Sequence, residues 1–335
     1  MLLFLFMFAA ANFNLILVLI ELPMTKTRIS SLVPKCLVLL FILLSTSNVM
    51  AQKSTTALYV DSINKWHTDR EEVLKSPKGW LNLEGLFWLH KGVNTFGVSK
   101  NNDCVYENPN PSDVFFPDHL GNFIFDGDSV IWENLDKYMV KVNNQNTFTG
   151  SKVCVFNGKG LSLEMAWSHF TWTIIKREDK IGVRFRNLKS DHVLLFKGIA
   201  HFPINEKFKI NAVLEAPMVP YLMISNVLGQ QVASKNAGKL NFTFQSKQYS
   251  LDVIDEGDGL FFITFGDLTS GKTTYGAGRF IYIKKPDANG HTVIDFNQAF
   301  NPPCAFTQFA TCPLPPPQNR LPFAITAGEK NYGHH

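Results

Sequence analysis

From Trp80 onward, apolar and polar residues alternate with a period of two in short segments separated by turn residues. Asp126-Gly127, between two apolar runs, favours a hairpin turn within 121–133. Further strands are predicted at 170–176, 181–186, 193–196, 209–214, 239–244, 248–254, 260–265 and within 269–283. Short strands with almost no helical period between them indicate antiparallel sheets. We therefore predict a mostly β fold, either an antiparallel β-sandwich or an open barrel.

One helix and one irregular segment flank these strands. Residues 57–75 show helical spacing, and Pro77-Lys78-Gly79 ends the predicted N-terminal helix. The segment from Asp295 to Lys330 is rich in Pro, Asn, Thr and Phe, and its prolines cannot donate to a sheet ladder. Because its phenylalanines need burial, we predict an ordered but irregular Pro-rich C-terminal segment. No linker composition divides the strands, so residues 52–335 are predicted to form a single β domain.

The N-terminus has the pattern of a signal peptide, which we predict to span residues 1–51. The basic region contains Lys26, Arg28 and Lys35, and the short apolar run at 36–44 follows it. A cleavage site with small residues comes next, at Val49-Met50-Ala51. The apolar run is much shorter than the about 20 residues that cross a membrane, so no stable membrane span is expected after processing. The apolar segment before Met24 lacks a basic flank, which favours Met24 as the true start; a long signal or an N-terminal anchor is the alternative. The mature protein, starting at Gln52, is expected to be exported, to the periplasm or the extracellular space.

Composition and charge narrow the class of protein. With 45% hydrophobic and 18% charged residues, the chain is too apolar for wholesale disorder. The formal net charge is +4, and the leader supplies +2 of it from three basic residues against Glu21, so +2 remains for residues 52–335. Nucleic-acid-binding proteins normally carry a strongly basic stripe, so no nucleic-acid partner is expected.

The C-terminal segment carries rare strings in a fixed order. Residues 301–321 read NPPCAFTQFATCPLPPPQNRL, and AGEK follows at 327–330. This pattern resembles the C-terminal signature of the DUF1684 family, a bacterial and archaeal group of unknown function. Further blocks that resemble the family are 67–72, 79–89, 174–186, 265–280 and 295–301, so that the resemblance covers 61–333. Many relatives have Tyr where this chain has Phe300 and Phe309, and the resemblance implies no activity.

Basic residues gather on one predicted hairpin. Arg184 and Arg186 share one face of the strand 181–186, and Lys176 and Arg177 end the preceding strand. Three or four cations on one face suit a carboxylate or a phosphate, since Arg binds both through a bidentate fork. The alternative is a solvated face, or internal ion pairs with the acids of the same region.

The C-terminal segment offers many polar groups. We predict that it folds back over Gly276 and Gly278, where the absence of side chains permits close approach, and that it closes a pocket with Arg279 and the Arg184 face. The expected ligand-binding residues are Lys176, Arg177, Arg184, Arg186, Arg279, Asn297, Asn301, Asn319, Arg320 and Lys330. The alternative is that these amides and cations cap backbone groups of a Pro-rich loop.

Four cysteines remain after the leader: Cys104, Cys154, Cys304 and Cys312. Export permits disulfides, and we expect a disulfide between Cys304 and Cys312. Free thiols, or a metal-binding or catalytic role, are the alternatives. The spacing between Cys304 and Cys312 matches zinc sites poorly, and the scattered histidines form no Cys–His signature. Neither a metal site nor a cofactor is predicted, because no motif for either is present.

Three hypotheses of function remain open. The first is an exported protein that binds a small anionic molecule, a carboxylate or a phosphate. The second is a metal-independent, hydrolase-like enzyme in which Asp295 and Glu329 form an acid–base pair and arginines clamp the substrate. The third is a structural protein of the cell envelope. The sequence leaves the oligomeric state open.

Overall fold

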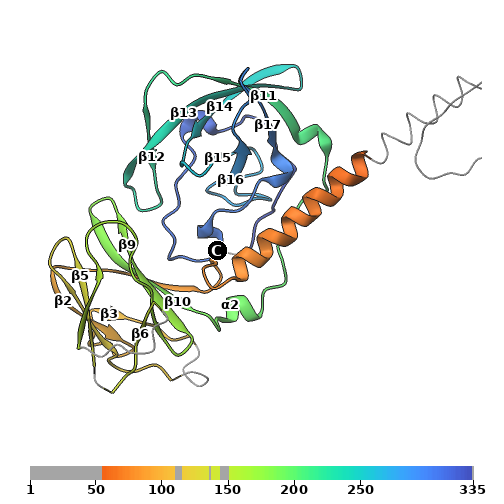
Figure 1. The fold of residues 1–335 in the computed structure, drawn as a ribbon. Helices are drawn as coiled ribbons and strands as arrows, with labels where there is room; N and C mark the ends of the chain where they lie inside the picture. Colours follow the sequence, from red (N-terminus) through yellow and green to blue (C-terminus); the bar gives the residue numbers. More distant parts are fainter. Residues whose placement is uncertain (1–54, 110–114, 136, 144–150, 334–335) are drawn as a thin grey trace, which may run out of the picture. The chain divides into compact units, whose positions relative to one another are not determined.

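The computed structural model describes residues 55–109, 115–135, 137–143 and 151–333. The predicted leader, with its start at Met24 and its cleavage site after Ala51, lies outside these residues. The chain divides into two units, Met1–Tyr59 and Val60–His335, and the description below concerns the second. Figure 1 shows its helices and strands in the order of the chain.

The predicted N-terminal helix is confirmed over residues 55–75, the orange helix of Figure 1. Ile63, His67 and Leu74 are buried, and this spacing of four and seven residues places them on one face. The chain turns directly after the helix, where Asn82 Nδ2 donates to the carbonyl oxygens of Ser76 and Pro77. Within the described residues, no helix combines the length and apolar character that crossing a membrane needs.

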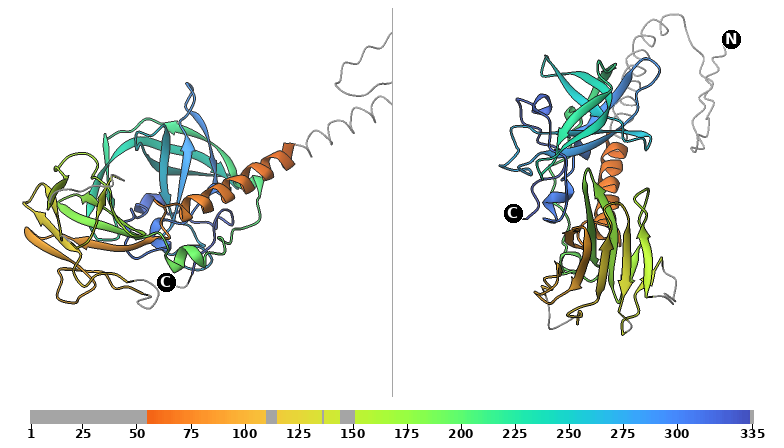
Figure 2. Two further views of the ribbon diagram at one scale, coloured as in Figure 1. Left: turned by 60° about the horizontal axis from the view of Figure 1, so that its bottom comes forward. Right: turned by 90° about the vertical axis from the view of Figure 1, so that its left-hand side faces the viewer.

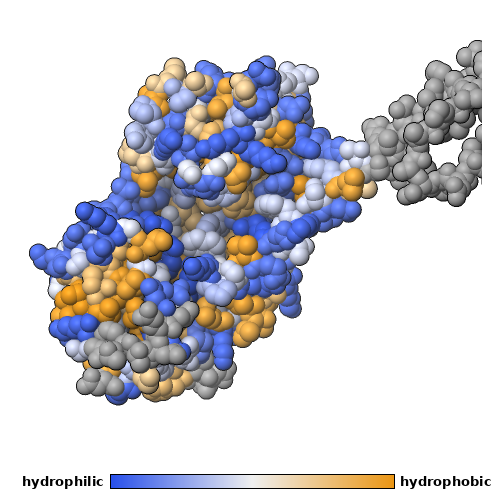
Figure 3. Space-filling model, in the orientation of Figure 1, coloured by the Kyte–Doolittle hydropathy of each residue, from blue (hydrophilic) through white to orange (hydrophobic). Residues whose placement is uncertain are grey.

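Two five-stranded sheets form a β-sandwich. One has the order β1 (Leu83–Trp88), β10 (Lys180–Asn187), β9 (Phe170–Arg177), β8 (Met165–Trp167) and β6 (Lys141–Val142). The other has the order β3 (Cys104–Val105), β2 (Gly92–Gly97), β4 (Gly121–Phe125), β5 (Val130–Asn134) and β7 (Lys152–Phe156). Both sheets contribute aromatic side chains to one core, among them Phe96, Trp132, Trp172 and Phe185. On the face shown in Figure 3, hydrophobic residues gather over this sandwich.

A seven-stranded antiparallel sheet forms a nearly closed barrel. Its order is β16 (Arg279–Lys284), β15 (Leu260–Phe265), β14 (Lys247–Ile254), β13 (Gln231–Phe244), β11 (Lys209–Glu215) and β17 (His291–Asp295), with β12 (Tyr221–Ser225) on β13. β16 and β17 also contact each other, which brings the two ends of the sheet together. Its core includes Leu240, Phe265 and Phe296. The strands of sandwich and barrel form separate groups in Figure 2. The predicted mostly β fold is thus confirmed, and both predicted architectures are present.

One predicted strand is wrong. Residues 193–196 lie partly in the short helix α2 (Asp191–Leu194) and partly directly after it. Ser190 is the N-cap of this helix, since the Ser190 side chain accepts a hydrogen bond from the backbone N–H of His192. The short helix η1 (Glu206–Phe208) follows, directly before β11. Apolar side chains in a four-residue run do not distinguish a strand from one helical turn.

The C-terminal segment (residues 295–330) is ordered and irregular, as predicted. It contains three short 3-10 helices, η2 (Phe296–Gln298), η3 (Pro303–Ala305) and η4 (Pro317–Asn319). Isolated bridges attach it to the barrel, for example between Phe300 and Phe280 and between Arg320 and Gly266. At Gly278, which precedes β16, φ is +100° and a Cβ atom would lie 2.6 Å from Pro315 Cγ. The predicted return of this segment over the glycine-bearing part of the barrel is therefore confirmed at Gly278.

Candidate functional site

A cavity of about 600 Å³, the aromatic pocket, lies among the N-terminal helix, the β9–β10 hairpin, the barrel and the C-terminal segment. Six aromatic residues line it: Trp66, Trp80, Phe262, Phe280, Tyr282 and Phe300. Its charged lining residues are Asp69, Arg70, Arg177, Arg184 and Glu256. A volume of this size holds a small organic molecule, and a mostly apolar wall with a few polar groups is typical of ligand sites.

The aromatic wall follows from the period of two in β16. Ile281 and Ile283 point into the barrel core, so Phe280 and Tyr282 point outward into the pocket. Phe300 of the C-terminal segment stacks on Tyr282, with ring centroids 5.8 Å apart and an angle of 17° between the ring planes. It also meets Phe280 edge to face at 5.9 Å. The C-terminal segment thereby completes a wall that the barrel begins.

Arg184 is a cation of the pocket with an unpartnered buried nitrogen among the residues that the structure describes. Its neighbours in β10, Val183 and Phe185, are buried in the sandwich core, so Arg184 faces outward into the pocket. Its guanidinium carbon lies 5.1 Å from the ring of Trp80, and its Nε is buried without a hydrogen-bond partner. Burial, together with the charges of Arg177 and Arg186, lowers the pKa of Arg184 to about 10. A negatively charged ligand would offset both the burial of the guanidinium and the repulsion from the two like charges.

The other two cations of the pocket have protein partners. Arg70 Nε lies 2.6 Å from Glu329 Oε1, and its Nη2 donates to the carbonyl oxygen of Asn301 at 2.9 Å. The guanidinium of Arg70 also lies 4.3 Å from the centre of the Phe300 ring. Arg177 Nε donates to Thr311 Oγ1 at 3.1 Å. Both arginines therefore fasten the C-terminal segment to the pocket, and both add positive charge near Arg184.

The two acids that line the pocket were not among the predicted catalytic residues. Tyr282 Oη donates to Glu256 Oε2 at 3.0 Å, and partial burial raises the pKa of Glu256. Asp69 pairs with the exposed Lys65 at 2.7 Å. In the sequence, Glu256 stands in the string DEGDG, which resembles a solvated turn, so only its hydrogen bond with Tyr282 reveals its position.

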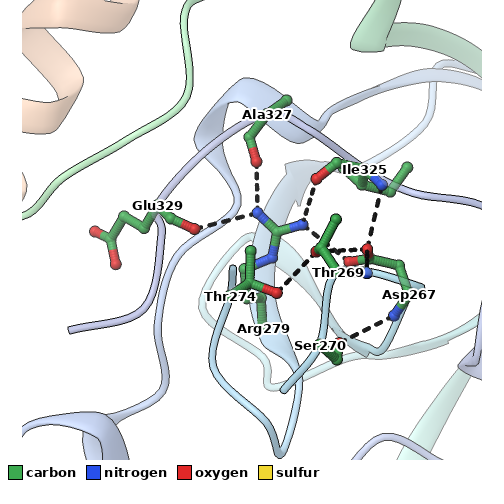
Figure 4. Close-up of polar contacts among 8 residues, drawn as sticks. All are labelled: Asp267, Thr269, Ser270, Thr274, Arg279, Ile325, Ala327 and Glu329. Carbon is green, nitrogen blue, oxygen red and sulfur yellow. Dashed lines mark hydrogen bonds and ion pairs between the residues drawn. The ribbon is translucent and has the colours of Figure 1, made fainter. Parts of the chain in front are cut away.

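Arg279 lies in a buried network (Figure 4) and does not line the aromatic pocket. Its Nη2 lies 2.9 Å from Asp267 Oδ2 and donates to the carbonyl oxygen of Ile325 at 2.9 Å. Its Nη1 donates to the carbonyl oxygens of Ala327 at 2.5 Å and Glu329 at 3.3 Å. The guanidinium thus fastens the C-terminal segment to the barrel. The predicted approach of the segment to Arg279 is present, but these contacts serve the fold.

The predicted amide residues also bind backbone. Asn297 exchanges hydrogen bonds with the backbone of Asn205 through Nδ2 and Oδ1. Asn319 donates to the carbonyl oxygens of Asp252 and Thr264 and accepts from the N–H of Asp252. Asn301 Nδ2 donates to the carbonyl oxygen of Lys330 at 2.7 Å. These contacts match the alternative in which the amides cap the irregular segment.

The remaining predicted cations lie in different places. Arg186 donates to Asn82 Oδ1 at 2.7 Å and to the carbonyl oxygen of Gly79, so it anchors the turn after the N-terminal helix. Lys176 lines a smaller cavity of about 340 Å³ that shares Arg177 and Glu256 with the aromatic pocket. Arg320 bridges to Gly266, and the Nζ of Lys330 lies 5.0 Å from the ring of Phe202.

Asp295 and Glu329, the predicted catalytic pair, have separate surroundings. The side chain of Asp295 caps η2 by accepting from the N–H of Asn297. Glu329 is buried, binds Arg70 and accepts from the N–H of Asn301 at 2.7 Å. Burial raises the pKa of Glu329 against the opposing effect of Arg70. Neither carboxyl lines the aromatic pocket, where Asp69 and Glu256 stand instead.

The predicted disulfide is absent. All four described cysteines are free thiols, although Cys304 and Cys312 do lie together, as the prediction required. The backbone N–H of Cys304 donates to Cys312 Sγ at 3.1 Å, which shows how close the two residues lie. Cys312 also lines the aromatic pocket. Among the residues that the structure describes, no three potential ligands gather into a metal site.

Comparisons with known proteins place part of this chain in a family. No curated protein matches it. A solved structure of an uncharacterised protein from Haloarcula marismortui is similar at 24% identity and a TM-score of 0.36, over 42% of this chain and 80% of that chain. Residues 195–330 match the family described as "Protein of unknown function (DUF1684)". This range holds the barrel and the whole C-terminal segment, whereas the sandwich lies outside it. The barrel and C-terminal segment of this chain thus belong to the DUF1684 family.

Proposed function

We propose that this protein is exported and binds a small organic anion in the aromatic pocket. The ligand has an apolar or aromatic body and carries a carboxylate or a phosphate. The observation that carries this proposal is Arg184, a cation in an apolar wall whose buried Nε has no hydrogen-bond partner within the described part of the chain. Export rests on the leader pattern of residues 1–51.

The physical argument starts from the energy of burying charge. A guanidinium removed from water is unfavourable unless an acid or several acceptors compensate it. Arg279 has one carboxylate and three carbonyl oxygens as partners of its Nη atoms, although its Nε, like that of Arg184, is buried without a hydrogen-bond partner. Arg184 instead has Trp80 beside it and Arg177 and Arg186 as like charges. Such an arrangement favours a bound anion, which would meet positive charge and aromatic rings together.

The pocket also bears on the two other hypotheses. A structural protein of the cell envelope needs no cavity of about 600 Å³ lined by six aromatic residues. A hydrolase-like enzyme is a second candidate because Glu256, with a raised pKa and a hydrogen bond from Tyr282, lines the same pocket as Arg184. In this form of the enzyme hypothesis, Glu256 takes the acid–base role that the sequence assigned to Asp295 and Glu329. The enzyme hypothesis requires turnover of a bound anion and its loss in Glu256→Gln.

Calorimetry with matched ligands tests the proposal. Phenylacetate and phenyl phosphate are titrated into the full chain, with the neutral isostere phenylacetamide as the ligand control. We expect at least one of the anions to bind and phenylacetamide to bind more weakly. Arg184→Met should abolish the difference between the anions and the amide, because the thioether keeps the apolar contact without the charge.

Lys180→Met is the matched control variant. Lys180 lies four residues before Arg184 in β10, is exposed and does not line the pocket. Its loss should leave the affinity for the anions unchanged. Equal affinity for anion and amide in the wild type, or full anion binding by Arg184→Met, would contradict the proposal.

A further inference from the structure

Cys304 and Cys312 form a close pair, of which Cys312 lines the aromatic pocket. The backbone N–H of Cys304 donates to Cys312 Sγ at 3.1 Å, and the two thiols also contact each other through a hydrogen bond. Backbone hydrogen bonds fix both positions: those from Ala305 to Pro302 and from Phe306 to Pro303 hold Cys304 in η3, and the N–H of Val227 donates to the carbonyl oxygen of Cys312 at 3.0 Å. The backbone therefore holds the two sulfurs as neighbours without a covalent bond.

The two thiols differ in access and in acidity. Cys304 is partly exposed, whereas Cys312 is buried and faces the pocket. The hydrogen bond from Cys312 lowers the pKa of Cys304, and the same contact with burial raises the pKa of Cys312. A partly exposed thiol beside a buried thiol is the arrangement of an attacking and a resolving cysteine.

We propose that Cys304 and Cys312 are a reversible dithiol–disulfide couple that exchanges with small disulfides carrying carboxylates. The Cys304 thiolate attacks one sulfur of the substrate disulfide, forms a mixed disulfide and releases one substrate thiolate. Cys312 then loses its proton to solvent and attacks Cys304 Sγ, which forms the Cys304–Cys312 disulfide and releases the second substrate thiolate. The protein dithiol is oxidised by two electrons, the substrate disulfide is reduced to two thiols, and the two protons lost by the cysteines balance those that the products take up.

The charge around the pair selects the substrate class. Arg184 acts electrostatically on Cys312, and Arg184 and Arg177 line the pocket that Cys312 faces. Positive charge attracts an anionic disulfide and repels a cationic one. This inference does not depend on the proposed ligand, because the exchange requires only a disulfide that reaches Cys304.

The test uses the reduced full chain and two disulfides, anionic oxidised glutathione and cationic cystamine. After acid quenching and alkylation, peptide mass spectrometry reports the state of each cysteine. We expect a Cys304–Cys312 disulfide that excess dithiothreitol reverses, formed about tenfold faster with oxidised glutathione than with cystamine at low salt. Cys154 is exposed and serves as an internal control, since an isolated accessible thiol should retain glutathione as a mixed disulfide.

Two variants separate the roles of the pair. Cys312→Ala should leave glutathione on Cys304, and Cys304→Ala should leave Cys312 largely unmodified because it is buried. The wild-type measurement stands even if either variant fails to fold. The proposal is overturned if both thiols stay free under conditions that modify Cys154, or if wild-type Cys304 keeps a lasting mixed disulfide. Equal rates with the two disulfides would overturn the assigned substrate class.

Discussion

Arg279 Nη2 and Asp267 Oδ2 lie 2.9 Å apart, with 0% and 1% of their side chains exposed. Asp267 Oδ1 accepts further hydrogen bonds from Thr269, from both its backbone N–H and its Oγ1, and from the backbone N–H of Ile325. The pair therefore joins the turn after β15, the start of β16 and the C-terminal segment. Because this segment also forms a wall of the aromatic pocket, the pair supports the pocket from a distance.

Arg279→Met should lower the free energy of unfolding by about 3–5 kcal/mol, because it leaves the Asp267 carboxylate buried without its cation. Urea unfolding followed by circular dichroism measures this change. The double variant Arg279→Met with Asp267→Asn should lose less than the sum of the single variants, since neither charge then remains alone. Additive losses would show that the two residues act independently.

Arg184→Met should behave in the opposite way. Removal of a poorly compensated cation from an apolar wall should leave the free energy of unfolding unchanged or raise it by about 1–2 kcal/mol. The same denaturant titration, run beside Arg279→Met, measures it. A loss comparable to that of Arg279→Met would mean that Arg184 holds the fold together and would remove the main support for the proposed anion site.

The sequence pattern predicted that both Arg184 and Arg279 line a pocket, and the aromatic pocket contains Arg184 but not Arg279. A period of two fixes which residues of a strand face outward, so Arg184 could be assigned opposite Val183 and Phe185. The same pattern does not show what covers the outer face. Arg70 was missed because a charged residue on a helix resembles a solvated one, and its partner Glu329 lies 259 residues away. Such long-range pairs leave no local signal in one sequence.

Gly278→Ala should destabilise the protein by roughly 2 kcal/mol or more, because its φ of +100° disfavours any side chain and a Cβ would lie 2.5 Å from the carbonyl oxygen of Phe265. Gly276→Ala is the matched control, since the nearest atom to its Cβ would be 3.7 Å away. Thermal unfolding of both variants makes the comparison. Equal melting temperatures would contradict the close contact between Gly278 and the C-terminal segment.

His67 should make stability depend on pH below neutrality. Its ring is buried and stacks on His201, with centroids 4.2 Å apart and 7° between the planes. Burial, followed by the charges of His201 and Arg70, lowers the pKa of His67 from 6.5 to about 4. Between these pH values the unfolded chain therefore binds a proton at His67 that the folded chain does not bind. The contribution of His67 to the free energy of unfolding is complete above pH 6.5 and is lost as the pH falls from about 6.5 to about 4.

The expected loss from His67 over this interval is about 3 kcal/mol in the free energy of unfolding. Urea unfolding of the wild type and of His67→Gln at several pH values between 4 and 7.5 isolates it as the difference between the two curves. His291→Gln, at an exposed site on β17, is the control and should follow the wild type. Parallel curves for the wild type and His67→Gln would show that the folded protein accommodates the charged imidazole, because a residue buried in neutral form must produce divergence as the pH falls.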